Sequence, residues 1–196
     1  MKLEDIHLQY NTDKGTDHNY VPFYDTVFED LRLKENNLLE IGVLHGGSLK
    51  MWHDFFENSH VYGVEDFSQQ IGFSTPVVQE DVERSLLEYP RAKLFVYNSE
   101  DKDQAAQNLE GLQFDIIIDD ASHHIDNQLR NIETYFPFLS PDGIYIIEDV
   151  TSGHHANLCM QKLDELSGKT SEMVEFNVSS RADDRLVVLQ NTASSV

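Results

Sequence analysis

The sequence has little positive charge. Only 14 of its 196 residues are Lys or Arg, against 35 Asp and Glu, so the formal net charge is −21 at pH 7. A surface of this sign repels phosphate backbones and anionic lipid headgroups. We therefore expect no nucleic-acid partner and no membrane partner, and expect a small-molecule partner instead.

Cysteine and long apolar runs are also scarce. Cys159 is the single cysteine, so an intrachain disulfide cannot form. The sequence contains no apolar run near the roughly 18 residues of a membrane span. Its first ten residues, MKLEDIHLQY, lack the apolar core of a signal peptide. Together these features predict a cytoplasmic protein.

The chain does have the composition of a globular domain. Apolar residues make up 40% and charged residues 25% of its length, which is enough to build one ordinary buried core. No repeat, low-complexity tract or Pro/Gly/Ser linker divides it. We expect a single domain over residues 1–196.

Short apolar runs alternate with longer amphipathic stretches. Five runs predict strands: Asn37–Gly42, His60–Glu65, Lys93–Tyr97, Phe114–Asp119 and Gly143–Glu148. Because they are apolar almost throughout, we expect parallel strands covered on both faces. Helices are predicted at Tyr20–Leu31, Ser48–Phe56, Asp101–Leu109, Ile125–Phe138 and His154–Leu166.

The end of the chain predicts two more strands. Met173–Val178 and Arg185–Gln190 are joined by the turn-like SSRADD, which favours an antiparallel pair at a sheet edge. The whole pattern predicts an α/β fold: a three-layer, Rossmann-like doubly wound sheet of about seven strands, mostly parallel with an antiparallel last strand. Residues 68–92 are long for one connection and predict an extra helix or a surface flap, a possible insert.

A glycine-containing loop follows the first predicted strand, in Glu40–Ser48 (EIGVLHGGS). Glycine lets the backbone approach a ligand closely at such a turn. The loop is neither GxGxxG nor GxxxxGK[ST], which disfavours a dinucleotide and a P-loop. Glu65 ends the second strand, where an acid can accept both hydroxyls of a ribose, although a solvated strand-end carboxylate is the alternative. S-adenosylmethionine fits this combination.

Acids follow the fourth and fifth predicted strands. Asp119 and Asp120 end one, and Glu148 and Asp149 end the other. Both strand ends lie at the same sheet edge, where four carboxylates repel one another unless a cation or raised pKa values relieve them. Oxygen ligands favour a hard ion such as Mg²⁺. The alternative is that some of these acids cap the following helices.

His123 lies three residues beyond Asp120 and has the intrinsic pKa of a general base near neutral pH. A competing interpretation is an HxD pair, His124 and Asp126, as in Fe(II) oxygenases, but the βαβ pattern disfavours it. His154 and His155 stand at a predicted helix start, where solvation is the simpler interpretation.

These motifs resemble the class I S-adenosylmethionine-dependent methyltransferases. The similarity is greatest to Mg²⁺-dependent macrolide-sugar O-methyltransferases, the mycinamicin methyltransferase and cephalosporin hydroxylase family. It covers residues 9–190 and is carried by four segments. These are NTDKG with HNY near the start, LLEIGVLHGGSLKMW with VYGVE, the stretch DIIIDDASHHIDNQLRNIETYFPFLSPDGIYIIEDV, and RADDRLVVL.

The resemblance implies roles for individual residues. His123 would be the general base, and the metal ligands would be Asp120, Glu148 and Asp149. The cofactor-binding residues would be Asp13, Lys14, Tyr20, Glu40, Gly42, Gly46, Ser48, Glu65, Asn98, Ser99, Asp119 and Asp120. Gly42 and its loop would contact the methionine part of the cofactor, and Asp13, Lys14 and Tyr20 would close over that end. Asn98 and Ser99 would flank the adenine, although the family commonly has a Gly-Asp-Gln-type sequence there.

The acceptor is where the chain departs from this family. Antibiotic-modifying members carry an additional N-terminal portion, whereas here residues 1–35 precede the first predicted strand and are expected to cover the cofactor. The acceptor pocket would then be open, completed by another subunit of a homo-oligomer, or walled by Phe73, Val77, Val78 and Tyr89. We expect O-methylation of a sugar or polyol hydroxyl, with a catechol as second choice. A non-catalytic S-adenosylmethionine-binding or assembly protein is the alternative.

Overall fold

A seven-stranded sheet in the order β3-β2-β1-β4-β5-β7-β6 organises the chain. The computed structural model describes residues 2–68, 76–176 and 183–190. The strands are β1 Asn37–Ile41, β2 His60–Glu65, β3 Ala92–Val96, β4 Phe114–Asp119, β5 Leu139–Ile147, β6 Glu172–Glu175 and β7 Arg185–Gln190. Strand β7 pairs antiparallel with both β5 and β6, and the other pairs are parallel. The predicted fold class is confirmed.

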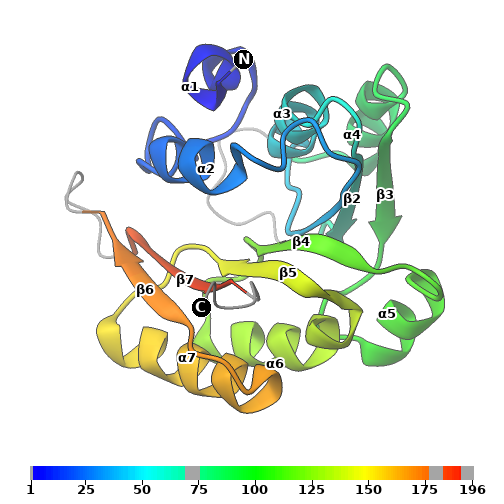
Figure 1. Cartoon of the computed structure of the whole chain (residues 1–196). Helices are drawn as coiled ribbons and strands as arrows, with labels where there is room; N and C mark the ends of the chain where they lie inside the picture. The colour runs from blue at the N-terminus through cyan, green and yellow to red at the C-terminus, as the bar shows by residue number, and fades with distance from the viewer. Residues whose placement is uncertain (1, 69–75, 177–182, 191–196) are drawn as a thin grey trace.

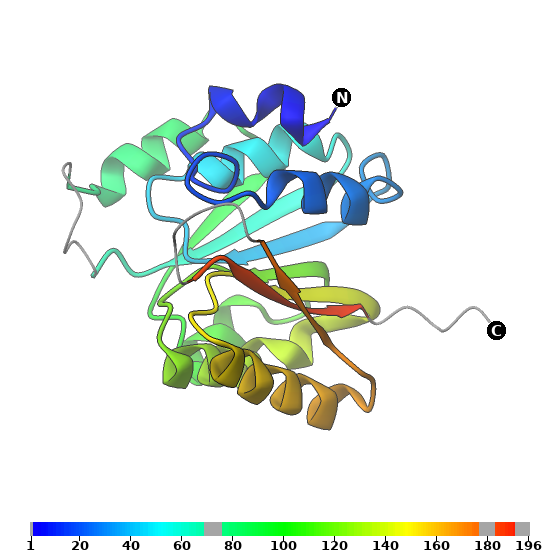
Figure 2. The ribbon, with the colours of Figure 1, turned by 90° about the vertical axis from the view of Figure 1, so that its left-hand side faces the viewer.

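Helices cover both faces of this sheet and make three layers (Figures 1 and 2). One face carries α1 Leu3–Ile6, α2 Val21–Phe28, α3 Gly47–Phe55 and α4 Gln79–Leu86. The other carries α5 Lys102–Asn108, α6 Ile125–Tyr135 and α7 Gly153–Ser167. Short 3₁₀ turns follow α1 at His7–Gln9 and α6 at Phe136–Phe138.

Two apolar cores lie on opposite sides of the sheet, because successive side chains of a strand point to opposite faces. In β1, Leu38 packs under α1–α4 while Leu39 packs against the α5–α7 side. Strand β5 divides in the same way between Ile146 and Tyr145. Burial on both faces explains why these strands are nearly continuous apolar runs in the sequence.

Element boundaries differ from the sequence predictions by a few residues. The largest difference is in β5, which begins at Leu139 rather than at Gly143. The antiparallel edge pair of β6 and β7 is confirmed over Glu172–Glu175 and Arg185–Gln190. The rest of the predicted strand, residues 177 and 178, and the first four residues of the SSRADD turn lie outside the described residues.

The segment 68–92 contains the extra helix that its length predicted. Helix α4 packs into the core through Val82 and Leu86. Val77 is also a core residue, and the Tyr89 ring lies edge-on to His53. The expectation that Val77 walls an acceptor pocket is therefore wrong, because this side chain is buried in the core. Tyr89 is partly exposed and Val78 is exposed, so their role as a wall stays a prediction. Phe73 lies outside the described residues.

The N-terminal segment before α2 crosses the sheet at the carboxyl ends of the parallel strands. Its close approach to α3 depends on Gly47, the first residue of that helix. A Cβ at this position would lie 1.8 Å from the carbonyl oxygen of Asn11. Glycine thus allows the segment to pass directly over the loop between β1 and α3.

Across residues 2–68, 76–176 and 183–190, the helices are all too short or too polar to span a bilayer.

Candidate active site

A cavity of about 800 Å³ opens where the parallel strands end. Its walls come from the loops after β1, β2, β3 and β4 and from the N-terminal segment. The predicted site residues that line it are Asp13, Gly42, Ser48, Glu65, Asn98, Ser99, Asp120, His123 and Asp149. The cavity therefore joins the predicted cofactor loop and the predicted acid cluster in one space.

The loop after β1 is shaped by glycine. Gly42 has φ +90°, and a Cβ there would lie 2.2 Å from the carbonyl oxygen of Asp120. Gly46 has φ +74° and caps the N-terminus of α3 without lining the cavity. A side chain at Gly42 would push the β1 loop away from the β4 loop, so this residue holds the two halves of the site together.

Glu65 fastens the same loop from the end of β2. One carboxylate oxygen, Oε2, accepts the backbone N–H groups of Val43 at 2.9 Å and Leu44 at 2.8 Å. The other, Oε1, accepts those of Asp66 and Phe67, each at 3.0 Å. Glu65 lines the cavity as predicted, and it also organises the backbone around the place expected for a ribose.

Glu40 is buried beneath the loop and does not line the cavity. Its carboxylate accepts hydrogen bonds from Ser48 Oγ at 2.7 Å and Trp52 Nε1 at 3.2 Å. Burial raises the pKa of this carboxyl, and the nearby ammonium of Lys14 opposes the rise. Glu40 thus anchors α3 to β1 from below the cavity.

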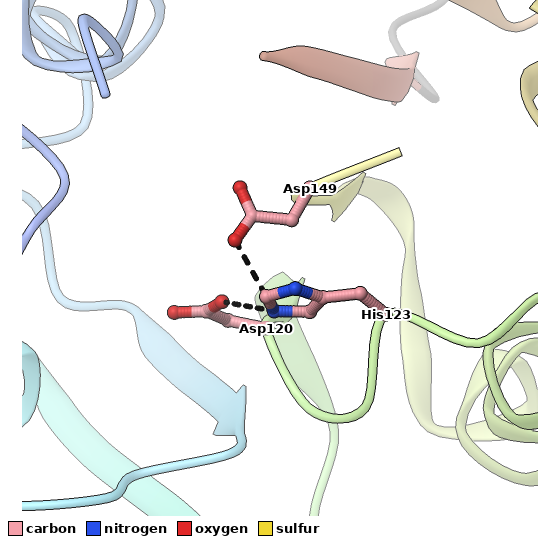
Figure 3. A group of neighbouring side chains, drawn as sticks. All are labelled: Asp120, His123 and Asp149. Atoms are coloured by element: carbon pink, nitrogen blue, oxygen red, sulfur yellow. Dashed lines mark ion pairs between the residues drawn. The ribbon is translucent and has the colours of Figure 1, made fainter. Parts of the chain in front are cut away.

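The acid cluster forms around His123 (Figure 3). Its Nε2 lies 3.1 Å from Asp149 Oδ2 and 3.8 Å from Asp120 Oδ1. One ligand atom from each of the three residues lies within 4.8 Å of the others. Asp120 and His123 reach this point from the loop after β4, and Asp149 from the end of β5, as the strand order predicts.

Electrostatics favour the protonated form of His123. Burial lowers its pKa, but the hydrogen bond to Asp120 and the charges of Asp149 and Asp183 outweigh burial and raise it to about 9. Burial and the charge of Asp120 raise the pKa of Asp149 to about 6, so it is ionised at neutral pH. His123 is thus a positive partner for the carboxylate oxygens that face it.

Lys14, which lies in the N-terminal segment, contacts the acid cluster. The sequence did not predict this contact. The Lys14 ammonium group is 1% exposed and donates to Asp120 Oδ2 at 2.5 Å and to both oxygens of Glu148 at 2.9 Å. Tyr24 also donates a hydrogen bond to Glu148. Glu148 therefore faces Lys14 and Tyr24, behind Asp120, and is not among the residues that line the cavity.

Tyr20, from the same segment as Lys14, contacts the other acid of the cluster, Asp149. Its hydroxyl donates to Asp149 Oδ1 at 2.7 Å, and the tyrosine ring is fully buried against His18. His18 Nε2 lies 3.5 Å from the same carboxylate oxygen. Lys14 and Tyr20 were predicted to close over the methionine end of a cofactor, but neither lines the cavity. Both polar groups contact carboxylates instead.

Asp119 points to the opposite face of the sheet from the cavity. Its Oδ1 accepts hydrogen bonds from Asn131 Nδ2 at 3.1 Å and from the backbone N–H of Ala121 at 3.3 Å. Burial raises its pKa to about 7. Asp119 thus fastens α6 to the turn that carries Asp120, and it does not touch the cavity.

The side of the cavity where adenine was predicted is polar. Asn98 and Ser99 line it together with Glu100, whose carboxylate accepts from Asn127 Nδ2 at 2.7 Å and pairs with Arg130 Nε at 2.7 Å. Two histidines that the sequence singled out lie away from the cluster. His124 precedes α6 as its N-cap residue, and His155 contacts Thr151 rather than the cluster.

Curated proteins similar to this chain are O-methyltransferases by name. Mycinamicin VI 2''-O-methyltransferase of Micromonospora griseorubida is 31% identical over 162 residues, which is 78% of this chain and 37% of the relative. Demethylmacrocin O-methyltransferase of Streptomyces fradiae is 32% identical over 166 residues, with the same coverage. The chain thus spans little more than a third of the length of these relatives.

Solved structures show the same fold. The MycE methyltransferase of the mycinamycin pathway, in a complex with Mg, SAH and mycinamycin VI, superposes with a TM-score of 0.67 at 22% identity. That match covers 100% of this chain and 57% of the other. Fibrillarin from Aeropyrum pernix, with bound S-adenosyl-L-methionine, matches at a TM-score of 0.58 and 13% identity, over 78% of this chain and 65% of the other.

A sequence profile described as a methyltransferase domain matches residues 39–150, from β1 to the acids after β5. This span is more than half of the chain and contains the glycine loop, Glu65, Asp120, His123 and Asp149. The resemblance inferred from the motifs is confirmed, and the chain belongs to the methyltransferase-domain family.

Proposed function

We propose that this protein transfers a methyl group from S-adenosylmethionine to a hydroxyl oxygen of a sugar or polyol, with Mg²⁺ as the metal. One observation carries the proposal: a single cavity leads from the glycine loop to the cluster of Asp120, His123 and Asp149. The names of the relatives, all O-methyltransferases, support the same chemistry, and one of them names a rhamnosyl tetracenomycin as the compound methylated.

The cavity walls fit the proposed cofactor. Gly42 lines the cavity, and its missing Cβ lets the β1 loop lie directly against the backbone of Asp120, so backbone atoms of the β1 loop would face the methionine end. Glu65 lies at the wall expected for the ribose, and Asn98 and Ser99 at the wall expected for adenine. The N-terminal segment adds Asn11, Thr12, Asp13, Thr16 and Asp17 to the lining, in keeping with a cofactor-covering role for this segment of a single domain.

The acids fit a hard divalent ion. Asp120 and Asp149 would hold it through the oxygens that face His123, and both are carboxylates of the kind that Mg²⁺ prefers. Glu148, the third predicted ligand, contacts Lys14 and Tyr24 in this structure. When bound, Mg²⁺ would supply a positive charge that lowers the pKa of an acceptor hydroxyl.

The chain's own groups would then move the proton. His123 takes the hydroxyl proton at Nε2 when the imidazole is neutral, and Asp149 beside it stabilises the resulting cation. A bond forms between the acceptor oxygen and the methyl carbon while the carbon–sulfur bond of the sulfonium breaks. The electron pair stays on sulfur, giving S-adenosylhomocysteine. Alignment of the two substrates in one cavity supplies much of the rate.

A non-catalytic cofactor-binding protein is the second candidate function. It would share the glycine loop and Glu65 but would have no use for His123 between two carboxylates. Four acids at one sheet edge cost stability through mutual repulsion. The presence of two of these acids beside His123 at the cavity wall therefore favours the enzyme.

A direct test is to incubate the protein with S-adenosylmethionine, Mg²⁺ and a panel of neutral sugars, glycosides and catechols. Mass spectrometry should show S-adenosylhomocysteine and an acceptor heavier by one methylene. His123→Ala and a reaction with EDTA are the controls, and both should lose product. Cofactor binding without methyl transfer to any hydroxyl compound would favour the non-catalytic candidate.

A further inference from the structure

The N-terminal segment provides two hydrogen-bond donors to the acid cluster. Lys14 Nζ donates to Asp120 Oδ2 at 2.5 Å, and Tyr20 Oη donates to Asp149 Oδ1 at 2.7 Å. Both donors are buried, with Lys14 1% and Tyr20 0% exposed. Each carboxylate thus has one oxygen fixed by the segment.

The second oxygen of each carboxylate faces His123. Asp120 Oδ1 lies 3.8 Å and Asp149 Oδ2 3.1 Å from His123 Nε2. A carboxylate held by one oxygen cannot rotate without breaking that bond, so the orientation of the other oxygen is set as well. The two donors therefore aim two oxygens at the same point in the cavity wall.

We infer that Lys14 and Tyr20 are positioning residues that preset Asp120 and Asp149 for a divalent ion, instead of contacts for the methionine end of the cofactor. This inference rests on the metal site of the proposed function. Hydrogen bonds behind the ligands of a metal commonly fix ligand orientation, and their loss typically weakens metal binding 10- to 100-fold.

The packing around Tyr20 allows its hydroxyl to be removed alone. The ring stacks on His18 with 4.8 Å between centroids and meets Phe176 edge-on at 5.2 Å. Tyr20→Phe keeps these contacts and removes the hydrogen bonds of the hydroxyl group, to Asp149 Oδ1 at 2.7 Å and to the carbonyl oxygen of Asp183 at 3.2 Å. Tyr135→Phe is the matched control, because its buried hydroxyl bonds to Tyr97 on the other side of the sheet.

Lys14→Met separates two explanations of the role of Lys14, because they predict opposite changes in cation affinity. Removing a positive charge next to Asp120 should tighten cation binding if Lys14 acts only as a competing counter-ion. If Lys14 orients Asp120, binding should weaken although the local charge has become more negative. Lys14 also lies 3.4 Å from Glu40 Oε1, so this variant leaves three buried acids with less compensation.

The experiment measures Mn²⁺ binding from the signal of free Mn²⁺ in electron paramagnetic resonance, with no turnover required. We expect wild-type protein and Tyr135→Phe to bind alike, and Tyr20→Phe and Lys14→Met to bind about 10-fold more weakly. The affinity for S-adenosylhomocysteine, measured by calorimetry without metal, should stay within twofold in Tyr20→Phe. If Lys14→Met fails to fold, Tyr20→Phe decides the matter.

Each result separates the inference from the proposed function. Unchanged Mn²⁺ affinity in Tyr20→Phe, or tighter binding in Lys14→Met, overturns the positioning role while leaving the methyltransferase proposal intact. If Tyr20→Phe loses affinity for S-adenosylhomocysteine while its Mn²⁺ affinity is unchanged, the positioning role is also overturned, and Tyr20 is a cofactor-binding residue instead. A wild-type protein that binds no Mn²⁺ overturns both the inference and the metal site. If Tyr20→Phe weakens Mn²⁺ binding but the wild-type protein transfers no methyl group, the result supports the positioning role and not the proposed function.

Discussion

The Glu65 carboxylate accepts the backbone N–H of Leu44 at 2.8 Å, so the end of β2 holds the loop between β1 and α3. The same oxygen accepts the N–H of Val43, and both residues line the cavity. A side chain predicted to bind a ribose therefore has a second task, which is to keep the predicted cofactor loop in shape.

Glu65→Gln should weaken S-adenosylhomocysteine binding by about 1–3 kcal/mol, because an amide group cannot accept all of these backbone donors. The same change should lower the free energy of unfolding, since buried N–H groups lose their partners. Calorimetry and urea unfolding measure the two effects. Glu110→Gln, at an exposed position, is the control. Unchanged affinity in Glu65→Gln would exclude Glu65 from the cofactor site.

Gly47→Ala should displace the N-terminal segment. The added Cβ would lie 1.8 Å from the carbonyl oxygen of Asn11, a clash that costs about 1–3 kcal/mol of stability when neighbours must shift. Asn11 and Asp13 line the cavity, so cofactor affinity should fall as well.

Gly153→Ala is the matched control for that change. Gly153 also occupies the first position of a helix, α7, and a Cβ there would meet no atom within 4 Å. This variant should be neutral or more stable by about 0.4–1 kcal/mol, as expected where alanine fits the backbone. Equal melting temperatures for the two variants would contradict the close approach of the segment to α3.

The sheet and the acid cluster could be predicted because they depend on local patterns and one topological rule. Apolar runs identified the strands, and parallel strand ends share an edge, which brought Asp120, His123 and Asp149 together. Strand alternation could also have separated Asp119 from Asp120, because neighbouring residues at a strand end point to opposite faces. Asp119 indeed contacts Asn131 of α6 rather than the cavity.

The contacts of Lys14 could not be read from the sequence. Its partners Asp120 and Glu148 are 106 and 134 residues away, and no spacing rule relates a lysine in the segment before α2 to acids at strand ends. Hydrophobic patterning predicts which elements pack together, but it does not say which buried polar groups will meet. The same reason explains why Tyr24, a core residue by pattern, was not expected to bond to Glu148.

His123 should titrate well above the ordinary range for histidine in the metal-free protein. Asp120 and Asp149 raise its pKa to about 9 against burial. NMR of the imidazole should show this value, and Asp149→Asn should lower it. Because the folded pKa exceeds the unfolded value of about 6.5, this pairing stabilises the fold fully below that pH and loses its effect as pH rises through about 9. A midpoint near 6.5 would show that the acids do not pair with His123.

Catalysis should require both a divalent ion and His123. EDTA should abolish methyl transfer and Mg²⁺ should restore it, because the ion offsets the acids that hold His123 protonated. Asp120→Asn should be folded and inactive, whereas His123→Ala should keep cofactor and Mn²⁺ affinity while kcat falls about 10²–10⁴-fold. Circular dichroism provides the folding control. Full turnover in chelator would leave the acids with a structural role only.

The acceptor should be a neutral polyol rather than a phosphorylated sugar. Asp13, Asp17, Asp66 and Glu100 line the cavity with the catalytic acids, in a chain of formal net charge −21. A phosphate group entering this space would meet like charges, with only the cation to compensate them.

A vicinal diol avoids this repulsion and offers a hard ion two oxygen ligands in one chelate. In a matched pair, a methyl glycoside should therefore be methylated with a kcat/KM at least 10-fold above that of its 6-phosphate, since a repulsion of about 1.4 kcal/mol suffices for that ratio. Raising the salt concentration should narrow the gap by screening the acids. Preference for the phosphorylated sugar, or methylation confined to amines or thiols, would overturn the acceptor class while leaving the cofactor site as proposed.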